Sequence, residues 1–94
     1  MKEAVFLPNE KLYVEVIVRF DTGGNVIPKE IVWNDGRHFS IDRILDVRQA
    51  ASLKAGGQGD RYTIRIGGQL RYLFFERSAE RTGRTLGKWF ITAA

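Results

Sequence analysis

The chain of 94 residues contains no cysteine, which excludes disulfide bonds, thiolate metal sites and cysteine nucleophiles. It also has no apolar run approaching the roughly 18 residues that a membrane-spanning helix requires. The apolar part of residues 1–8 is too short for a secretory signal peptide. We therefore expect a cytoplasmic protein that does not associate with a membrane.

Histidine is nearly as scarce, because His38 is the only one in the chain. Ser40 and Asp42 follow it on the same face of a predicted strand. Residues two apart on a strand lie roughly 7 Å from each other, which is too far for a preformed Ser–His–Asp relay. A single histidine cannot hold a metal ion unaided. The sequence therefore predicts no catalytic residue, no metal site and no cofactor, and a protein that is not an enzyme.

Two further patterns invite a chemical interpretation. Asp42 and Asp46 suggest paired carboxylates, but Arg43 and Arg48 follow them within two residues, so we predict surface ion pairs, each contributing about 0–1 kcal/mol. Residues 56–59 are rich in glycine, but they lack the Gly-Lys-Ser/Thr ending of a phosphate-binding loop. We predict that this segment is a flexible connector.

Positive charge is what the chain has in excess, with 15 lysines and arginines against 11 acidic residues and a net charge of +4. Arginine outnumbers lysine, which suits a polyanionic partner because guanidinium groups match phosphates and stack on bases. The same net charge is also ordinary for a soluble small domain. A hydrophobic share of 44% predicts a folded chain, and the length predicts a single domain spanning residues 1–94.

The strongest structural pattern is a β-hairpin around Asn34-Asp35-Gly36, a typical turn sequence. A two-residue loop would place Ile31 opposite Ser40 and so set apolar against polar side chains. A three-residue loop, with Gly36 in a left-handed conformation, places Ile31 opposite Phe39 and Trp33 opposite Arg37. We predict the three-residue loop, because it gathers five apolar side chains on one face: Ile27, Ile31, Trp33, Phe39 and Ile41.

The second arm of this hairpin changes face partway along. Phe39 and Ile41 are apolar at odd positions, whereas Arg43 breaks this alternation and Ile44 is apolar at an even position. We predict a bend or bulge near Asp42–Arg43. Such a bend allows one strand to contribute to two sides of a small barrel.

The alternation of apolar and polar residues predicts strands over residues 12–20, 26–33, 37–47, 61–66, 69–76 and 86–91, and glycine-rich turns separate several of them. Residues 1–11 form a predicted arm, 12–93 a barrel, and 49–55 at most one short helix. The predicted fold is all-β: a small antiparallel barrel or rolled sheet of five to six strands. An SH3-like barrel is preferred and an OB-like barrel is the alternative.

Arginines alternate with aromatic residues in the predicted hairpin of residues 61–76, as in proteins that bind single-stranded nucleic acid. The predicted nucleic-acid-binding residues are Arg61, Arg65, Arg71, Tyr72 and Phe74. In a second interpretation the aromatic residues are core and the arginines are solvated. In a third, strand 70–75, which is apolar on both faces, is a contact surface for a second copy or another protein.

Three segments together resemble a family of small uncharacterised bacterial β-barrel proteins: residues 33–46, residues 55–66 and Lys88-Trp89-Phe90-Ile91. The resemblance extends from about residue 12 onward and implies no activity and no functional residue. The order Trp, Gly-Arg, aromatic residue, bent strand, arginine–aromatic hairpin and late Trp is also similar to short domains that accompany bacterial DNA-repair polymerases. We therefore predict a non-catalytic module that binds or associates with DNA or RNA. The alternative is a protein-interaction module that homodimerises or docks through strand 70–75.

Overall fold

The computed structural model describes residues 11–51, 58–78 and 85–93, which form strands and no helix. This confirms the all-β prediction, but the seven strands exceed the predicted five to six. Gln49–Ala51 belong to a strand rather than to the predicted short helix, and Gln58 and Gly59 belong to a strand rather than to the predicted flexible connector. Residues 52–57 and most of the predicted arm lie outside the described part. The strands are β1 (Leu12–Phe20), β2 (Val26–Val32), β3 (His38–Ser40), β4 (Arg43–Ala51), β5 (Gln58–Ile66), β6 (Gln69–Arg77) and β7 (Gly87–Ala93).

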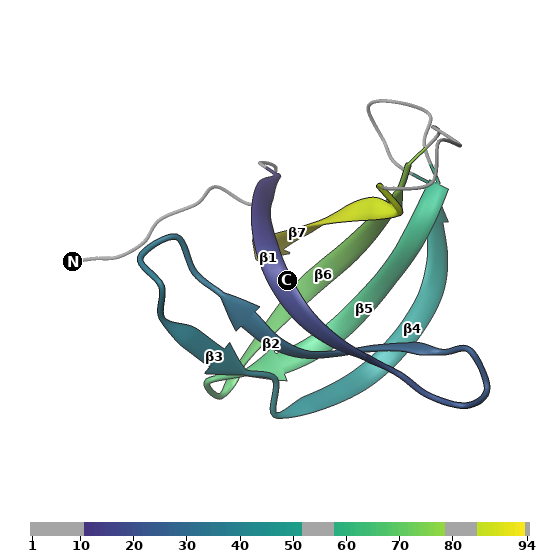
Figure 1. The fold of residues 1–94 in the computed structure, drawn as a ribbon. Helices are drawn as coiled ribbons and strands as arrows, with labels where there is room; N and C mark the ends of the chain where they lie inside the picture. Colours follow the sequence, from purple (N-terminus) through teal and green to yellow (C-terminus); the bar gives the residue numbers. More distant parts are fainter. Residues whose placement is uncertain (1–10, 52–57, 79–84, 94) are drawn as a thin grey trace.

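The strands form one antiparallel sheet in the order β3-β2-β1-β7-β6-β5-β4, curled into a half-barrel (Figure 1). β3 and β4 lie at opposite ends of this order although they are consecutive in the chain. The backbone N–H of Ile41 donates to the Lys29 carbonyl in β2 at 2.9 Å, and that of Asp42 donates to the Arg65 carbonyl in β5 at 2.9 Å. The predicted bend near Asp42–Arg43 is therefore confirmed. It splits the predicted strand 37–47 in two, which raises the strand count.

The β2–β3 hairpin has the predicted three-residue loop. Ile31 pairs with Phe39, and the Trp33 backbone N–H donates to the Arg37 carbonyl at 2.8 Å. Gly36 has a φ angle of +88°, in the left-handed region where a side chain would be strained. The turn sequence therefore sets the facing of the side chains next to the loop, as expected.

A bulge in β2 changes one detail of the predicted inner face. Ile17 pairs with Glu30 and Val18 with Pro28, which leaves Lys29 as the extra residue. A bulge next to Pro28 is consistent with the chemistry of this residue, because proline cannot donate to a strand ladder and is found at strand edges or bulges. The extra residue reverses the alternation, so the fully buried Pro28 faces the core. The expectation that Ile27 would share the face of Ile31 is therefore wrong.

The core fills the concave side of the half-barrel. Tyr62 and Ile64 of β5 are buried, as the alternation of this strand predicted. Tyr62 pairs with Leu73, so Leu73 also faces inward and Tyr72 faces outward. The buried cluster consists of Ile31, Tyr62, Ile64, Leu73 and Ile91, with Leu12, Val14, Val16, Trp33, Ile41, Ile44, Ile66, Phe75 and Trp89 packed against it.

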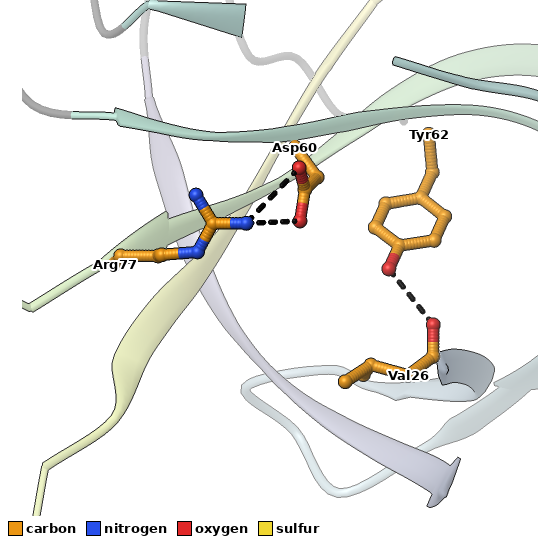
Figure 2. Close-up of polar contacts among 4 residues, drawn as sticks. All are labelled: Val26, Asp60, Tyr62 and Arg77. Atoms are coloured by element: carbon orange, nitrogen blue, oxygen red, sulfur yellow. Dashed lines mark hydrogen bonds and ion pairs between the residues drawn. The ribbon is translucent and has the colours of Figure 1, made fainter. Parts of the chain in front are cut away.

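Tyr62 joins two strands that are not neighbours in the sheet. Its hydroxyl donates to the Val26 carbonyl at the start of β2 at 2.8 Å, beside an ion pair between Arg77 and Asp60 at 3.1 Å (Figure 2). Burial raises the pKa of the Tyr62 hydroxyl; the negative charge of Asp60 adds to this rise and Arg77 opposes it. The tyrosine therefore holds the β1–β2 hairpin across the inner face of β5.

Tyr62→Phe is expected to lower the free energy of unfolding by about 1 kcal/mol at neutral pH, because it removes this hydrogen bond. The raised pKa of Tyr62 means that the unfolded chain releases the phenolic proton first as the pH rises. Wild-type stability should therefore fall as the pH rises above about 10.

Urea unfolding at neutral and alkaline pH measures both effects. Tyr62→Phe should lose less stability than the wild type between the two conditions. Tyr62→Phe should still lose some stability at alkaline pH, because the pKa of Tyr13 is also raised. Equal losses in the two proteins would show that Tyr62 does not release its proton on unfolding.

Candidate nucleic-acid interface

Four of the five predicted binding residues lie together on the outer, convex face of the sheet. Residues directly opposite each other in antiparallel strands share a face. Arg61 lies opposite Phe74, and Arg65 lies opposite Leu70, on the face away from Tyr62 and Leu73. Tyr72 shares this outer face with Phe74. The structure therefore brings together Arg61, Arg65, Tyr72 and Phe74.

Arg71 lies on the other face. It pairs with Ile64, which is fully buried, so its side chain faces the concave side. Its guanidinium donates to the Leu70 carbonyl at 2.8 Å and to the side-chain oxygen of Gln69. There it lines a cleft of about 350 Å³ together with Ile31, Trp33, Arg37, Phe39, Ile66, Gly67, Gln69 and Ile91. The sequence could not separate Arg71 from the other arginines, because β6 is apolar on both faces.

β4 adds two arginines, Arg43 and Arg48, which the sequence pattern indicated only as ion-pair partners. Arg43 lies directly opposite Arg65, and Arg48 lies directly opposite Arg61. We call Arg43, Arg48, Arg61 and Arg65 the arginine quartet. Finding it requires the pairing of β4 with β5, which shifts at a bulge between Ile44 and Asp46. The available signal in the sequence was the alternation of polar and apolar residues at 46–48. The structure continues this strand through residues 49–51, where a helix was predicted.

The arginine quartet is only partly neutralised by the protein. The predicted ion pair of Asp46 with Arg48 is present, with 2.8 Å between Oδ2 and Nε. Within the described part of the chain, no hydrogen bond or ion pair involves the side chain of Arg43 or Arg65. Like charges directly opposite each other destabilise a sheet. The two opposed arginine pairs therefore concentrate positive charge that an anion would relieve.

Arg61 is held against an aromatic ring. Its guanidinium carbon lies 4.6 Å from the centroid of Tyr72, and its Nε is buried with no hydrogen-bond partner within the described part of the chain. A guanidinium above a tyrosine ring is attracted by the electron density of the ring face. This contact limits how Arg61 can point and leaves the rest of its donors available to a ligand.

An aromatic row crosses the outer face beyond Tyr72. The ring of Tyr72 meets Phe74 edge-on with 6.4 Å between centroids, and Phe74 stacks on Phe90 of β7 at 4.6 Å. Phe90 in turn meets Tyr13 of β1 at 5.7 Å. Phe90 is only 6% exposed although it lies on the outer face. Phe74 therefore has a packing partner and supports Tyr72, which is the better placed of the two for contact with a base.

The charges at the β1 end of this row are paired within the protein. Glu76 accepts hydrogen bonds from Lys11 at 2.8 Å and from the Tyr13 hydroxyl at 2.9 Å. The bond to Glu76 raises the pKa of Lys11, while burial, followed by the bond to Glu76, raises the pKa of Tyr13. Lys88 lies above the Tyr13 ring at 5.5 Å. This end differs from the arginine quartet, which has a single internal ion pair within the described residues.

The remaining candidates from the sequence take other positions. His38 of β3 contacts Glu30 of the neighbouring strand β2, with 2.8 Å between Nδ1 and Oε1. Among the residues that the structure describes, no group of three or more histidines and carboxylates could hold a metal ion, and no helix could cross a membrane. Both edges of β6 are paired, so a partner at strand 70–75 would contact a face of this strand rather than an edge; Leu70, on the outer face, is 42% exposed.

Comparison with protein-family models, with curated proteins and with solved structures finds no match to this chain. A function is therefore inferred from the arrangement of its own residues.

Proposed function

We propose that the outer face of β4 and β5 binds the phosphate backbone of single-stranded DNA or RNA. The arginine quartet contacts phosphates, and Tyr72 contacts a base. The observation that carries this proposal is that two pairs of arginines lie directly opposite each other: Arg43 with Arg65, and Arg48 with Arg61. A polyanion would neutralise this charge, and the release of its counterions would drive binding.

The spacing of the arginine quartet suits an extended ligand. Arg61 and Arg65 lie four residues apart on one strand, which corresponds to about 13 Å. The two opposed pairs therefore offer four phosphate contacts, grouped at two places along β5. Tyr72 lies beside the site at Arg61, at 4.6 Å from its guanidinium. Aromatic and arginine side chains in this arrangement bind single strands by stacking and charge, without reading base sequence.

We also propose that the fold is an SH3-like rather than an OB-like barrel. If β3 and β4 are counted as one bent strand, each strand pairs with the next one in the chain, and β1 pairs with β7. An OB-fold is a Greek-key barrel, in which one connection skips a neighbouring strand. The consecutive pairing supports the SH3-like assignment.

Binding to a labelled oligonucleotide should weaken steeply with salt. If about four phosphates are neutralised, the affinity for a single strand should fall roughly 50-fold between about 50 and 200 mM salt. Arg61→Ala/Arg65→Ala removes two of these contacts, so the slope of log affinity against log salt should fall by about half. Fluorescence anisotropy with single- and double-stranded DNA and RNA would measure both quantities.

Lys29→Ala/Arg37→Ala is the matched control, because it also removes two positive charges and leaves the arginine quartet intact. This variant should keep most of the wild-type slope. An equal loss in both double variants would show that only net charge matters. Absence of binding at the lower salt concentration would show that the arginine quartet is a solvated surface.

A further inference from the structure

β4 is an unusually open edge of the sheet. It has nine residues, and within the described chain it pairs with β5 alone, at the end of the strand order (Figure 1). Proteins usually protect such edges with short strands, lysine or proline. The opposite edge, β3, follows this rule with three residues. β4 contains neither lysine nor proline, so its protection is limited to the bulge near Leu45 and to its charged side chains, and it exposes Leu45 at 43% and Val47 at 51%.

We propose that β4 pairs antiparallel with β4 of a second copy of this chain, about a two-fold axis at Val47. In this register Asp46 of each copy lies opposite Arg48 of the other. Both residues face outward, because they pair with Thr63 and Arg61 on the outer face of β5. The interface then contains two reciprocal pairs of opposite charge.

The charges of β4 favour this register over its two neighbours. A two-fold axis at residue 46 would place Asp46 opposite its own copy, and an axis at residue 48 would do the same with Arg48. Like charges directly opposite each other are unfavourable. An axis at Val47 avoids both arrangements and places the two exposed Val47 side chains against each other on the inner face. A self-complementary contact of this kind is what a symmetric dimer requires.

The dimer does not depend on nucleic acid, but it has a consequence for the proposed function. Pairing through β4 would extend the sheet from one copy into the next without a break. The arginine quartets of the two copies, which lie on the outer faces of β4 and β5, would then adjoin along one convex surface. A dimer would therefore offer a longer track for a single strand.

Sedimentation equilibrium of the purified protein over about a hundredfold range of concentration tests the dimer in the absence of nucleic acid. The wild type should show a reversible monomer–dimer equilibrium. Asp46→Arg would place two arginines opposite each other at each pair, and Arg48→Asp would place two aspartates there. Each single variant should weaken dimerisation roughly tenfold or more.

Two combinations should restore the dimer. Asp46→Arg/Arg48→Asp exchanges the charges within one chain and recreates both opposite-charge pairs. An equimolar mixture of the two single variants should form a heterodimer, because each chain then meets the complementary charge. Loss of folding in the single variants would not be repaired by mixing, so this outcome separates the interface from a local structural role. Circular dichroism would confirm that each variant is folded.

Asp35→Arg and Arg37→Asp are matched controls, because Asp35 and Arg37 form an ion pair of the same type and spacing, 2.7 Å apart, away from β4. They should leave the dimer unchanged. A wild-type protein that is monomeric at every concentration would overturn the proposal. So would single variants that dimerise like the wild type, or a mixture that fails to restore the dimer.

Discussion

Leu73→Ala is expected to lower the free energy of unfolding by about 2–5 kcal/mol, because it removes most of a side chain at the centre of the core. Leu73 has no exposed surface and lies directly opposite Tyr62 and Ile91. The loss combines the transfer energy of the side chain with the cost of the cavity that remains. It would remove a large part of the stability of a domain of this size, which is about 5–15 kcal/mol.

Leu70→Ala is the control for this prediction, because it makes the same change on the same strand at a side chain that is 42% exposed. It should cost less than about 1 kcal/mol. Urea unfolding of the two variants would measure the difference. Similar losses in both would contradict the register of β6, because a shift by one residue exchanges its inner and outer faces.

Gly59→Ala is expected to destabilise the fold by about 3 kcal/mol, although alanine is ordinarily the better residue in a strand interior. A Cβ at Gly59 would lie 2.0 Å from the carbonyl oxygen of Phe75 and 3.2 Å from the Cα of Glu76. These are backbone atoms of β6, so they cannot rotate away from the new methyl group. Relief would require β5 and β6 to separate at this point.

Gly23→Ala is the matched control for this effect. The nearest atom to a Cβ there is the Asn25 side-chain nitrogen at 3.2 Å, which lies at the end of an exposed side chain and can move. This substitution should change stability by no more than about 0.5 kcal/mol. Thermal unfolding of both variants checks the prediction. A neutral Gly59→Ala would show that the strands can relax by the width of a methyl group.

The local pattern of the chain was sufficient for several features of the fold. The turn at Asn34-Asp35-Gly36 gave the loop length, because only one register placed Ile31 opposite Phe39. The break in alternation at Arg43 located the bend that joins the two ends of the sheet. In each case the deciding pattern lies within a few neighbouring residues of the sequence, so turn chemistry and alternation were enough.

Part of the candidate site could also be predicted. Arg61 and Arg65 share a face because they lie four residues apart on one regular strand. Tyr72 and Phe74 were selected as a pair and do lie together. Arg71 was grouped with them incorrectly, since β6 is apolar on both faces and either register was compatible with its sequence.

By itself, the sequence determined the all-β class, the β2–β3 loop, the bend after Ile41 and the face of each residue from 61 to 66 in β5. Only the tertiary structure decided which strands meet: the register of β6 and the opposition of Arg43 and Arg48 to Arg65 and Arg61. The physical reason is that side-chain direction alternates with every residue. A single extra residue, such as Lys29 in β2 or the one at the bulge near Leu45 in β4, therefore exchanges the faces of the residues that follow it on the same strand. Local preferences set each strand, whereas packing around the core sets their pairing and, with it, the charged surface.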